Sequence, residues 1–220
     1  EYYGLDLSSG MLQSHPMYPS PRLTLGSIER LPFADGTFDV VMANHVLHHV
    51  PNLIHSVQEL KRVLKPNGTL ITATNSILSM YNLRRILHRS TVLLSRMGSQ
   101  VQPMLAPSDP YSLENGILVM KRYFYAVMRA DLPSTLVFTD AEPLLDYIES
   151  TRDLREPQLP PDVHWDDMMA ITRQQVTQII HTQGHLPIDK LTGVLVCTDS
   201  GDFVQAFVSL RQKLLATREE

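Results

Sequence analysis

Three short stretches of this 220-residue chain carry side chains that could hold a ligand. They are GLDLSSGML with Asp6, the turn-like GSIE at residues 26–29, and ANHVLHHV, in which Asn44 and His45 follow an apolar run. In an open α/β sheet, a carboxylate at a strand end can accept hydrogen bonds from both hydroxyls of a ribose. A short polar turn can offer a backbone N–H and a side chain to an adenine edge. The pattern predicts a nucleoside-cofactor site.

Histidines are concentrated in and after the third stretch, at positions 45, 48, 49 and 55. His45 and His49 have the i, i+4 spacing that could share a metal ion on a helix. ANHVLHHV contains no acidic or thiol partner, so we predict no metal site. Imidazole suits proton transfer near neutral pH, which makes His45 or His49 a candidate general base.

Alternating strands and helices must bring these stretches together. YYGLDL, FDVVMA and GTLITATN have the apolar pattern of strands, and LIHSVQELKRVLK has the spacing of an amphipathic helix that stops at Pro66-Asn67-Gly68. Such alternation favours a parallel sheet with a ligand crevice at the carboxyl ends of its strands. The expected fold class is therefore α/β.

The amino-acid composition and the spacing of apolar residues change along the chain, and these changes predict four regions. Residues 1–75 are expected to form a partial cofactor-binding core, and residues 76–135 a helical lid or substrate insertion. Residues 136–200 are expected to complete the sheet with its covering helices, and residues 201–220 to form a C-terminal helix.

The insertion is expected to contain two helices, at about 79–97 and 113–129. They could act as a lid or only enlarge the core, and their aromatic residues could line an apolar pocket or simply pack. Four arginines could hold an anionic substrate group, touch a membrane, or form a solvated helix face: Arg84, Arg85, Arg89 and Arg96.

The C-terminal region predicts two further helices and a pair of strands. FTDAEPLLDYIEST has the form of a helix capped by Thr139 or Asp140, and a longer helix is expected at about 166–182. LPIDKLTGVLVCTD indicates two strands that turn at either Asp189-Lys190 or Thr192-Gly193. An antiparallel hairpin is thus expected to end the sheet.

Composition limits the classes of partner. The 19 Lys and Arg residues and 23 Asp and Glu residues give a net charge of -4, which argues against nucleic-acid binding. The single cysteine, Cys197, suits a buried position in a reducing compartment, so we expect a cytoplasmic location. No apolar run reaches the roughly 20 residues of a spanning helix, which predicts no stable membrane insertion. A small molecule is the expected partner, and no feature indicates the oligomeric state.

Four blocks, GLDLSSGML, GSIERLPFADGTFDVV, ANHVLHHV and ELKRVLKPNGTLI, resemble the later motifs of class I S-adenosylmethionine-dependent methyltransferases of the ubiquinone and menaquinone biosynthesis type. The resemblance covers roughly the first third of the chain. It implies a Rossmann-like methyltransferase sheet with a terminal antiparallel hairpin, a helical lid, and methyl transfer from S-adenosylmethionine to a small and apolar molecule. By position it places Asp6 and Leu7 at the ribose, Ser27 and Ile28 at the adenine, and Asn44 near the methionine moiety.

Two departures from the family pattern affect this expectation. Ser27 stands where the family often has Asp, and the family's first strand and glycine-rich loop have no counterpart, since Gly98 and Gly116 are isolated and misplaced. We therefore expect a fragment of a longer methyltransferase that is inactive alone. The alternative is a noncatalytic methyltransferase-like binding or scaffold module. A dedicated base need not exist, because the sulfonium donor is already activated and alignment can suffice.

Overall fold

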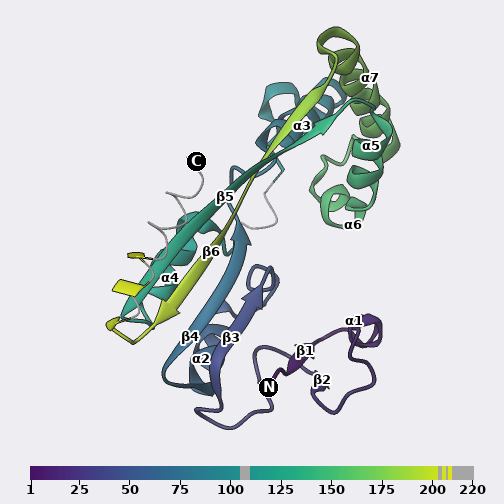
Figure 1. Ribbon diagram of the computed structural model, residues 1–220. Helices are drawn as coiled ribbons and strands as arrows, with labels where there is room; N and C mark the ends of the chain where they lie inside the picture. Colours follow the sequence, from purple (N-terminus) through teal and green to yellow (C-terminus); the bar gives the residue numbers. More distant parts are fainter. Residues whose placement is uncertain (105–109, 203–204, 207, 210–220) are drawn as a thin grey trace. The chain divides into compact units, whose positions relative to one another are not determined.

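The computed structural model describes residues 1–104, 110–202, 205–206 and 208–209 (Figure 1). The chain divides into two compact units, and each unit is built from separate segments of the sequence. Unit 1 comprises Glu1–Thr74, Pro110–Asp131 and Gly193–Glu220, and unit 2 comprises Asn75–Asp109 and Leu132–Thr192. The predicted four functional regions follow other boundaries and stay a prediction.

The elements alternate between strands and helices for most of the chain. Unit 1 contains β1 (Gly4–Asp6), α1 (Ser9–Ser14), β2 (Leu23–Leu25), β3 (Phe38–Asn44), α2 (Leu53–Val63), most of β4 (Leu64–Asn75) and α4 (Leu113–Met120). Unit 2 contains α3 (Tyr81–Leu94), α5 (Glu142–Glu149), α6 (Arg152–Arg155), α7 (Trp165–Gln183) and the short 3-10 helices Gly98–Gln100 and Glu156–Gln158. Two long strands contribute residues to both units: β5 (Ala126–Phe138) and β6 (Leu186–Thr198).

The strands form two sheets. β1 and β2 pair in parallel, with Gly4 opposite Leu23 and Asp6 opposite Leu25. A four-stranded sheet has the order β3-β4-β6-β5, in which β3 and β4 are parallel. The arrows of β5 and β6 point in opposite directions (Figure 1). The predicted α/β class is confirmed, and the sheet ends in the antiparallel pair of β6 and β5.

Unit 1 is held together by α2 against the sheet. The Asn52 side chain caps this helix by accepting a hydrogen bond from the His55 N–H at 3.0 Å. Val57, Leu60 and Val63 recur at helical spacing and are all buried. They belong to one apolar cluster with residues of β3, β4, α4 and β6, which are Ala43, Leu64, Leu70, Met120 and Leu195. Amphipathic spacing thus packs one side of α2 against this part of the sheet.

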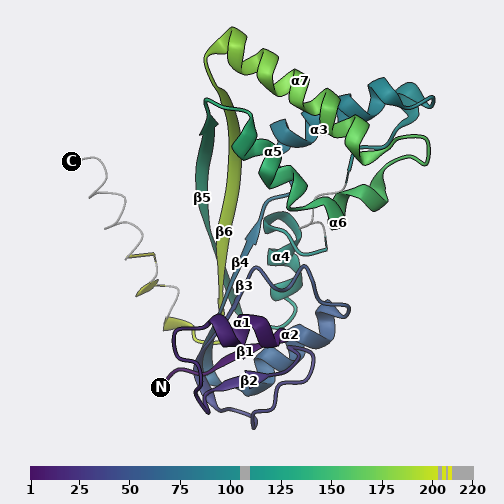
Figure 2. The same cartoon turned by 90° about the vertical axis from the view of Figure 1, so that its right-hand side faces the viewer.

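Unit 2 has its own core, around Trp165 at the start of α7. The buried cluster joins Trp165 and Met168 to α3 through Leu83 and Leu87, and to α5 through Ile148. Figure 2 shows α3 and α7 side by side. Gly184 ends α7 in the left-handed conformation at φ 79°, which glycine adopts without steric cost.

Several sequence-based expectations about secondary structure are wrong. The second insertion helix ends at Met120, and residues from Ala126 onward form β5, because a short apolar run is compatible with either structure until strand partners decide. The expected hairpin within residues 186–199 is one continuous strand, β6. Its neighbours are β4 and β5, so the antiparallel partner lies far away in the sequence.

Smaller differences concern element ends. α2 stops at Val63, and Pro66-Asn67-Gly68 lies within β4, where the pairing with β3 shifts between Phe38 and Val40. The N-cap of α5 is Ala141, although the Asp140 carboxylate accepts the Glu142 N–H at 3.1 Å. The three-residue strand β2 was not expected from the sequence. The expected helix at 201–220 falls mostly outside the described residues.

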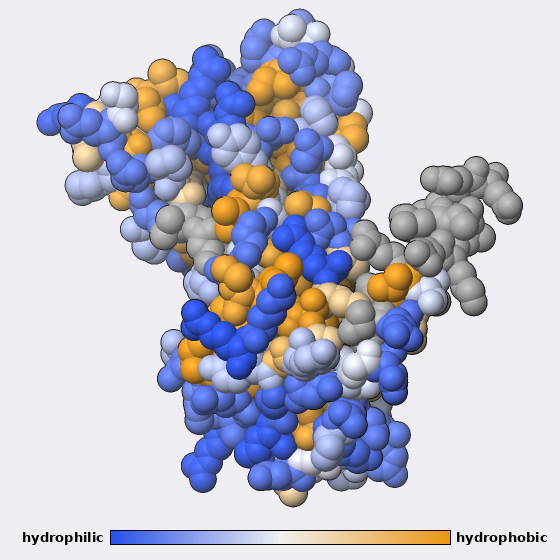
Figure 3. All heavy atoms as spheres, turned by 90° about the vertical axis from the view of Figure 1, so that its left-hand side faces the viewer, coloured by the Kyte–Doolittle hydropathy of each residue, from blue (hydrophilic) through white to orange (hydrophobic). Residues whose placement is uncertain are grey.

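Large apolar side chains also lie at the surface. On the face drawn in Figure 3, hydrophobic groups gather in patches among hydrophilic ones. The exposed apolar residues include Val40 and Met42 on β3, Leu93 on α3 and Leu118 on α4. In the part of the chain that the structure describes, no helix is long and apolar enough to cross a membrane.

Candidate functional site

The carboxylate of Asp6 lies at the end of β1, beside the end of β2. Asp6 pairs with Leu25, and the Gly26 N–H donates to the Asp6 backbone carbonyl oxygen at 3.0 Å. The Ser8 N–H donates to Asp6 Oδ1 at 2.8 Å, which orients the carboxylate. No hydrogen bond to Oδ2 is found among the described residues, so this oxygen can accept a donor from a ligand.

The polar turn predicted at residues 26–29 is present. The Ser27 hydroxyl oxygen accepts the Glu29 N–H at 3.1 Å, and the Arg30 N–H donates to the Ser27 carbonyl oxygen at 3.1 Å. Ile28 packs against the unit 1 core. Because Ser27 Oγ is an acceptor in this turn, its hydroxyl hydrogen is left to donate elsewhere.

Glu29 ties this turn to the amino end of α2, which the sequence did not indicate. Its Oε1 accepts the Asn52 N–H at 3.0 Å. Nearby, Glu59 Oε2 accepts the Leu31 N–H at 2.9 Å. These contacts join residues 23 and 28 positions apart, so no local pattern in the sequence could have revealed them.

Arg62 fixes the loop that leads into β3. Its guanidinium donates to Glu59 at 2.8 and 2.9 Å, to Asp35 at 2.7 Å, and to the carbonyl oxygens of Phe33 and Leu31 at 2.8 and 3.0 Å. The hydrogen bond from Arg62 holds the pKa of Glu59 below its usual range. The network therefore sets the path of residues 31–35.

The end of β3 bends sharply at His45, which has a left-handed backbone with φ 54°. The Asn44 position pairs with Ala73, and the His45 N–H donates to the Ala73 carbonyl oxygen at 2.8 Å. The following turn is anchored by the buried Leu47. Asn44, His45 and His49 are all exposed. The two histidines lie on a turn, so the helical spacing considered for a shared metal does not apply.

The histidine rings lie close to one another. The ring centroids of His48 and His49 are 4.1 Å apart, and those of His45 and His48 are 6.4 Å apart. His48 Nδ1 is buried and has no hydrogen-bond partner within the described part of the chain. Burial, and then the charges of His49 and His45, lower the pKa of His48 to about 4. Among the described residues, no three His, Cys, Asp or Glu side chains are arranged to hold a metal ion.

We expect His48 to make the stability of the fold sensitive to acid. Its pKa falls from 6.5 in the unfolded chain to about 4 in the folded chain, so between these values the unfolded chain binds more protons. The free energy of unfolding should thus fall as the pH drops from 7 to 5. Urea denaturation at both pH values should show a smaller drop for His48→Asn. The exposed His55→Asn variant should behave like the parent, and an undiminished drop in His48→Asn would contradict this assignment.

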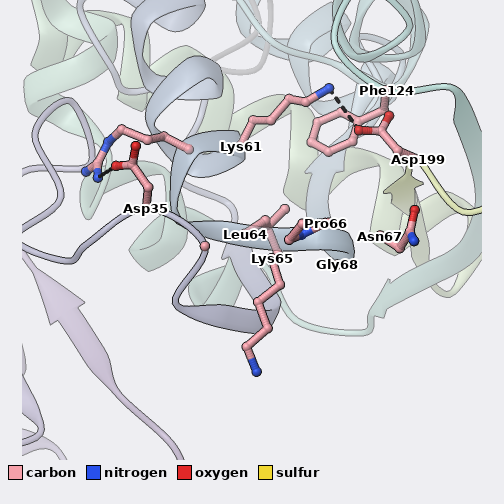
Figure 4. Close-up of a pocket in the computed structure, with 11 residues that line it drawn as sticks. Asp35, Lys61, Leu64, Lys65, Pro66, Asn67, Gly68, Phe124 and Asp199 are labelled. Atoms are coloured by element: carbon pink, nitrogen blue, oxygen red, sulfur yellow. Dashed lines mark hydrogen bonds and ion pairs between the residues drawn. The ribbon is translucent and has the colours of Figure 1, made fainter.

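A pocket of about 410 Å³ is lined by Leu64 and its neighbours (Figure 4). Leu64 pairs with Phe38 at the start of β3, so the pocket lies at the end of the β3-β4 pair opposite Asn44. Its cations are already paired: Lys61 Nζ lies 3.0 Å from Asp199 and 4.9 Å from the centre of the Phe124 ring, and Lys65 contacts Asp39 at 2.8 Å. Because Lys61 and Lys65 are already paired with carboxylates, the pocket offers little charge to a ligand. None of the predicted cofactor residues lines it.

The predicted residues fall into two connected groups. Asp6, with the exposed Leu7 after it, adjoins Ser27 and Ile28 through the β1-β2 pairing. Asn44 is the last residue of β3, and the hydrogen bond from the Asn52 N–H to Glu29 links the turn of the first group to the start of α2, which follows β3 in the sequence. The contacts of these residues with a cofactor stay predictions.

Comparison with known proteins supports this reading of the N-terminal part. Residues 1–72 match the family described as "Methyltransferase domain". The demethylmenaquinone methyltransferase of Bacillus licheniformis is 33% identical over 90 residues, which are 39% of each chain. The 2-phytyl-1,4-naphtoquinone methyltransferase of Trichormus variabilis is 35% identical over 75 residues, 31% of this chain and 33% of that protein. The chain thus spans about two-fifths of the length of the former relative.

Solved structures share the fold over a longer stretch. A methyltransferase assigned to antibiotic biosynthesis in Anabaena variabilis covers 89% of this chain and 81% of its own, with a TM-score of 0.56 and 17% identity. A methyltransferase of Bacillus halodurans has the same coverage, a TM-score of 0.51 and 14% identity.

Strand order and neighbours together define a class I methyltransferase fold, as the resemblance implied. Residues 1–72, about a third of the chain, are thus similar to the methyltransferase-domain family and to the demethylmenaquinone methyltransferase of Bacillus licheniformis.

Proposed function

We propose that this chain takes part in methyl transfer from S-adenosylmethionine to a small-molecule acceptor. The main support is the β1-β2 register, in which Asp6 at the end of β1 lies beside the Gly26-Ser27 turn at the end of β2. The free Oδ2 of Asp6 would accept from the ribose, the Ser27–Ile28 turn would face the adenine, and Leu7 would flank the ribose. Asn44 would lie near the methionine end. When bound, the cofactor supplies an activated methyl group on a sulfonium.

More residues are proposed to contact the adenosine half of the cofactor than its methionine half. β1 pairs only with β2 and β3 only with β4 among the described residues, so each has a free edge. Val40 and Met42 on β3 are 52% and 61% exposed. Our proposal includes a further parallel strand between these edges, followed by a glycine-rich loop supplied by chain outside these 220 residues.

The acceptor is proposed to be small and apolar. The named relatives act, by their names, on a demethylmenaquinone and on a phytyl naphthoquinone. Their similarity lies in the cofactor part of the fold, so it supports the reaction class more strongly than the acceptor. His45 and His49, exposed after β3, are the proposed sites for any proton transfer from the acceptor. The buried free thiol of Cys197 supports a cytoplasmic location as part of the proposal.

A noncatalytic methyltransferase-like module is the second candidate. It is favoured by one observation, the absence of any closely spaced glycines in the sequence, since glycines let a backbone approach a cofactor closely.

Calorimetric titration of S-adenosylhomocysteine decides between the two. We expect binding to a longer form of the chain that carries a glycine-rich loop upstream, and weak or no binding to the 220-residue chain. Absence of binding to both forms, when both are folded by circular dichroism, would contradict the enzymatic proposal and favour the noncatalytic module. Equal binding to both would contradict the need for an added loop.

A further inference from the structure

One face of α3 is exposed along its length. Tyr81, Arg85, Arg89 and Leu93 follow one another at i, i+4 steps and so lie in one stripe along the helix. All four are exposed, with Tyr81 at 51% and Leu93 at 63%. The opposite side of α3 is buried against α7 through residues such as Leu83 and Leu87. We refer to the four-residue stripe as the outer face of α3.

The outer face carries the positive charge of two arginines. The helix sequence YNLRRILHRSTVLL contains three arginines and no Asp or Glu. Arg84 donates to the carbonyl oxygens of Ile77 and Ser79 at the start of the helix. Arg85 and Arg89 form no ion pair within the described residues, whereas Arg62 and Arg152 each pair with more than one carboxylate. A solvated helix face usually mixes both signs, and this one does not.

Apolar groups flank these charges. Tyr81 and Leu93 bracket the two arginines on the helix, and the exposed Leu78 and Met97 continue the apolar character just beyond its two ends. Guanidinium groups bind phosphates through paired hydrogen bonds, while aromatic and aliphatic side chains settle among lipid headgroups and the first acyl carbons. The combination matches the surface of a bilayer with anionic lipids.

We propose that the outer face of α3 docks on an anionic lipid bilayer, with the helix lying along the surface. A helix of 14 residues is about 21 Å long, shorter than the hydrocarbon core of a bilayer, so it would lie on the membrane. Arg85 and Arg89 would contact lipid phosphates, and Tyr81 and Leu93 would enter the interface. This proposal does not depend on methyl transfer, because it concerns unit 2 alone.

Vesicle flotation tests the proposal directly. The chain should float with vesicles of phosphatidylglycerol and phosphatidylcholine, bind vesicles of phosphatidylcholine alone far less, and dissociate as salt is raised. Arg85→Gln with Arg89→Gln should weaken partitioning roughly 30-fold, since each arginine adds about a fivefold gain near an anionic surface. Leu93→Ser should also weaken it.

Matched variants on unit 1 serve as controls. Lys121→Gln with Arg122→Gln removes two exposed cations, and Leu118→Ser removes a leucine that is 66% exposed, close to the exposure of Leu93. These variants should partition like the parent chain. No flotation of the parent, or an equal loss in the control and test variants, would overturn the proposal. So would binding that is undiminished by either test variant, which would assign the lipid contact to another surface.

Discussion

Replacing Asp6 with alanine is expected to weaken binding of S-adenosylhomocysteine by at least about 100-fold in the form of the chain that binds it. The reason is the loss of two hydrogen bonds from ribose hydroxyls to a charged acceptor, each contributing about 1.5–3 kcal/mol. Isothermal titration calorimetry measures the change. Among the residues that the structure describes, the side chain of Asp6 accepts one hydrogen bond, from the Ser8 N–H, so the fold should survive the substitution.

Two further variants isolate the role of the Asp6 carboxylate. Asp6→Asn keeps an oxygen acceptor without the charge and should give an intermediate loss. Asp153→Ala removes an exposed carboxylate of α6 in unit 2 and should leave the affinity unchanged. An Asp6→Ala variant that is folded and binds as tightly as the parent would remove Asp6 from the site.

Replacing Trp165 with alanine is expected to cost unit 2 about 3–5 kcal/mol of unfolding free energy, the usual cost of emptying a large buried aromatic site. Trp165 is 2% exposed and packs in the cluster that joins α3, α5 and α7. Its Nε1–H donates to Glu149 Oε2 at 2.7 Å, and the Arg152 guanidinium lies 5.6 Å from the ring centre. Urea denaturation followed by far-UV circular dichroism is the suitable measurement, because Trp165 is the only tryptophan.

Trp165→Phe is the matched variant, since it keeps most of the apolar volume and loses the Nε1–H bond. It should cost clearly less than the alanine variant. Hydrogen exchange should locate the loss of protection in α3, α5 and α7. Equal costs for the two variants would mean that the hydrogen bond to Glu149, and not packing, dominates at this position.

Elements with a long, regular pattern could be predicted from the sequence. α7 was expected at about 166–182 and lies at Trp165–Gln183, and α2 differs from its prediction only at its end. Both helices have an apolar side repeated over several turns, which only a helix places on one face. The strand Phe38–Asn44 was likewise marked by its apolar run.

Elements that depend on distant partners could not be predicted in this way. The run from Ala126 is a strand because β6 lies beside it, and the turn expected at Asp189-Lys190 or Thr192-Gly193 does not occur because β6 runs unbroken between β4 and β5. A Cβ at Gly193 would lie 2.8 Å from the Ala130 carbonyl oxygen. This glycine therefore serves close strand packing and not a turn.

The candidate site shows the same limit. The positions of Asp6, Ser27 and Asn44 at strand ends could be predicted, because each follows an apolar run or turn signal. The hydrogen bonds that link the turn to α2 through Glu29, and the buried Nδ1 of His48, arise from tertiary contacts. Local sequence patterns do not reveal which distant side chains hydrogen-bond to a site and fix its geometry.

The interleaving of the two units has a consequence for synthesis on the ribosome. β4 is complete at Asn75, yet its sheet neighbour β6 begins only at Leu186, after most of unit 2 has been made. During that interval the nascent β3-β4 pair exposes an unpaired strand edge, which invites pairing with other chains. Contacts between such distant segments also slow folding. A chaperone that shields this edge until the last segment emerges would therefore raise the yield of native protein.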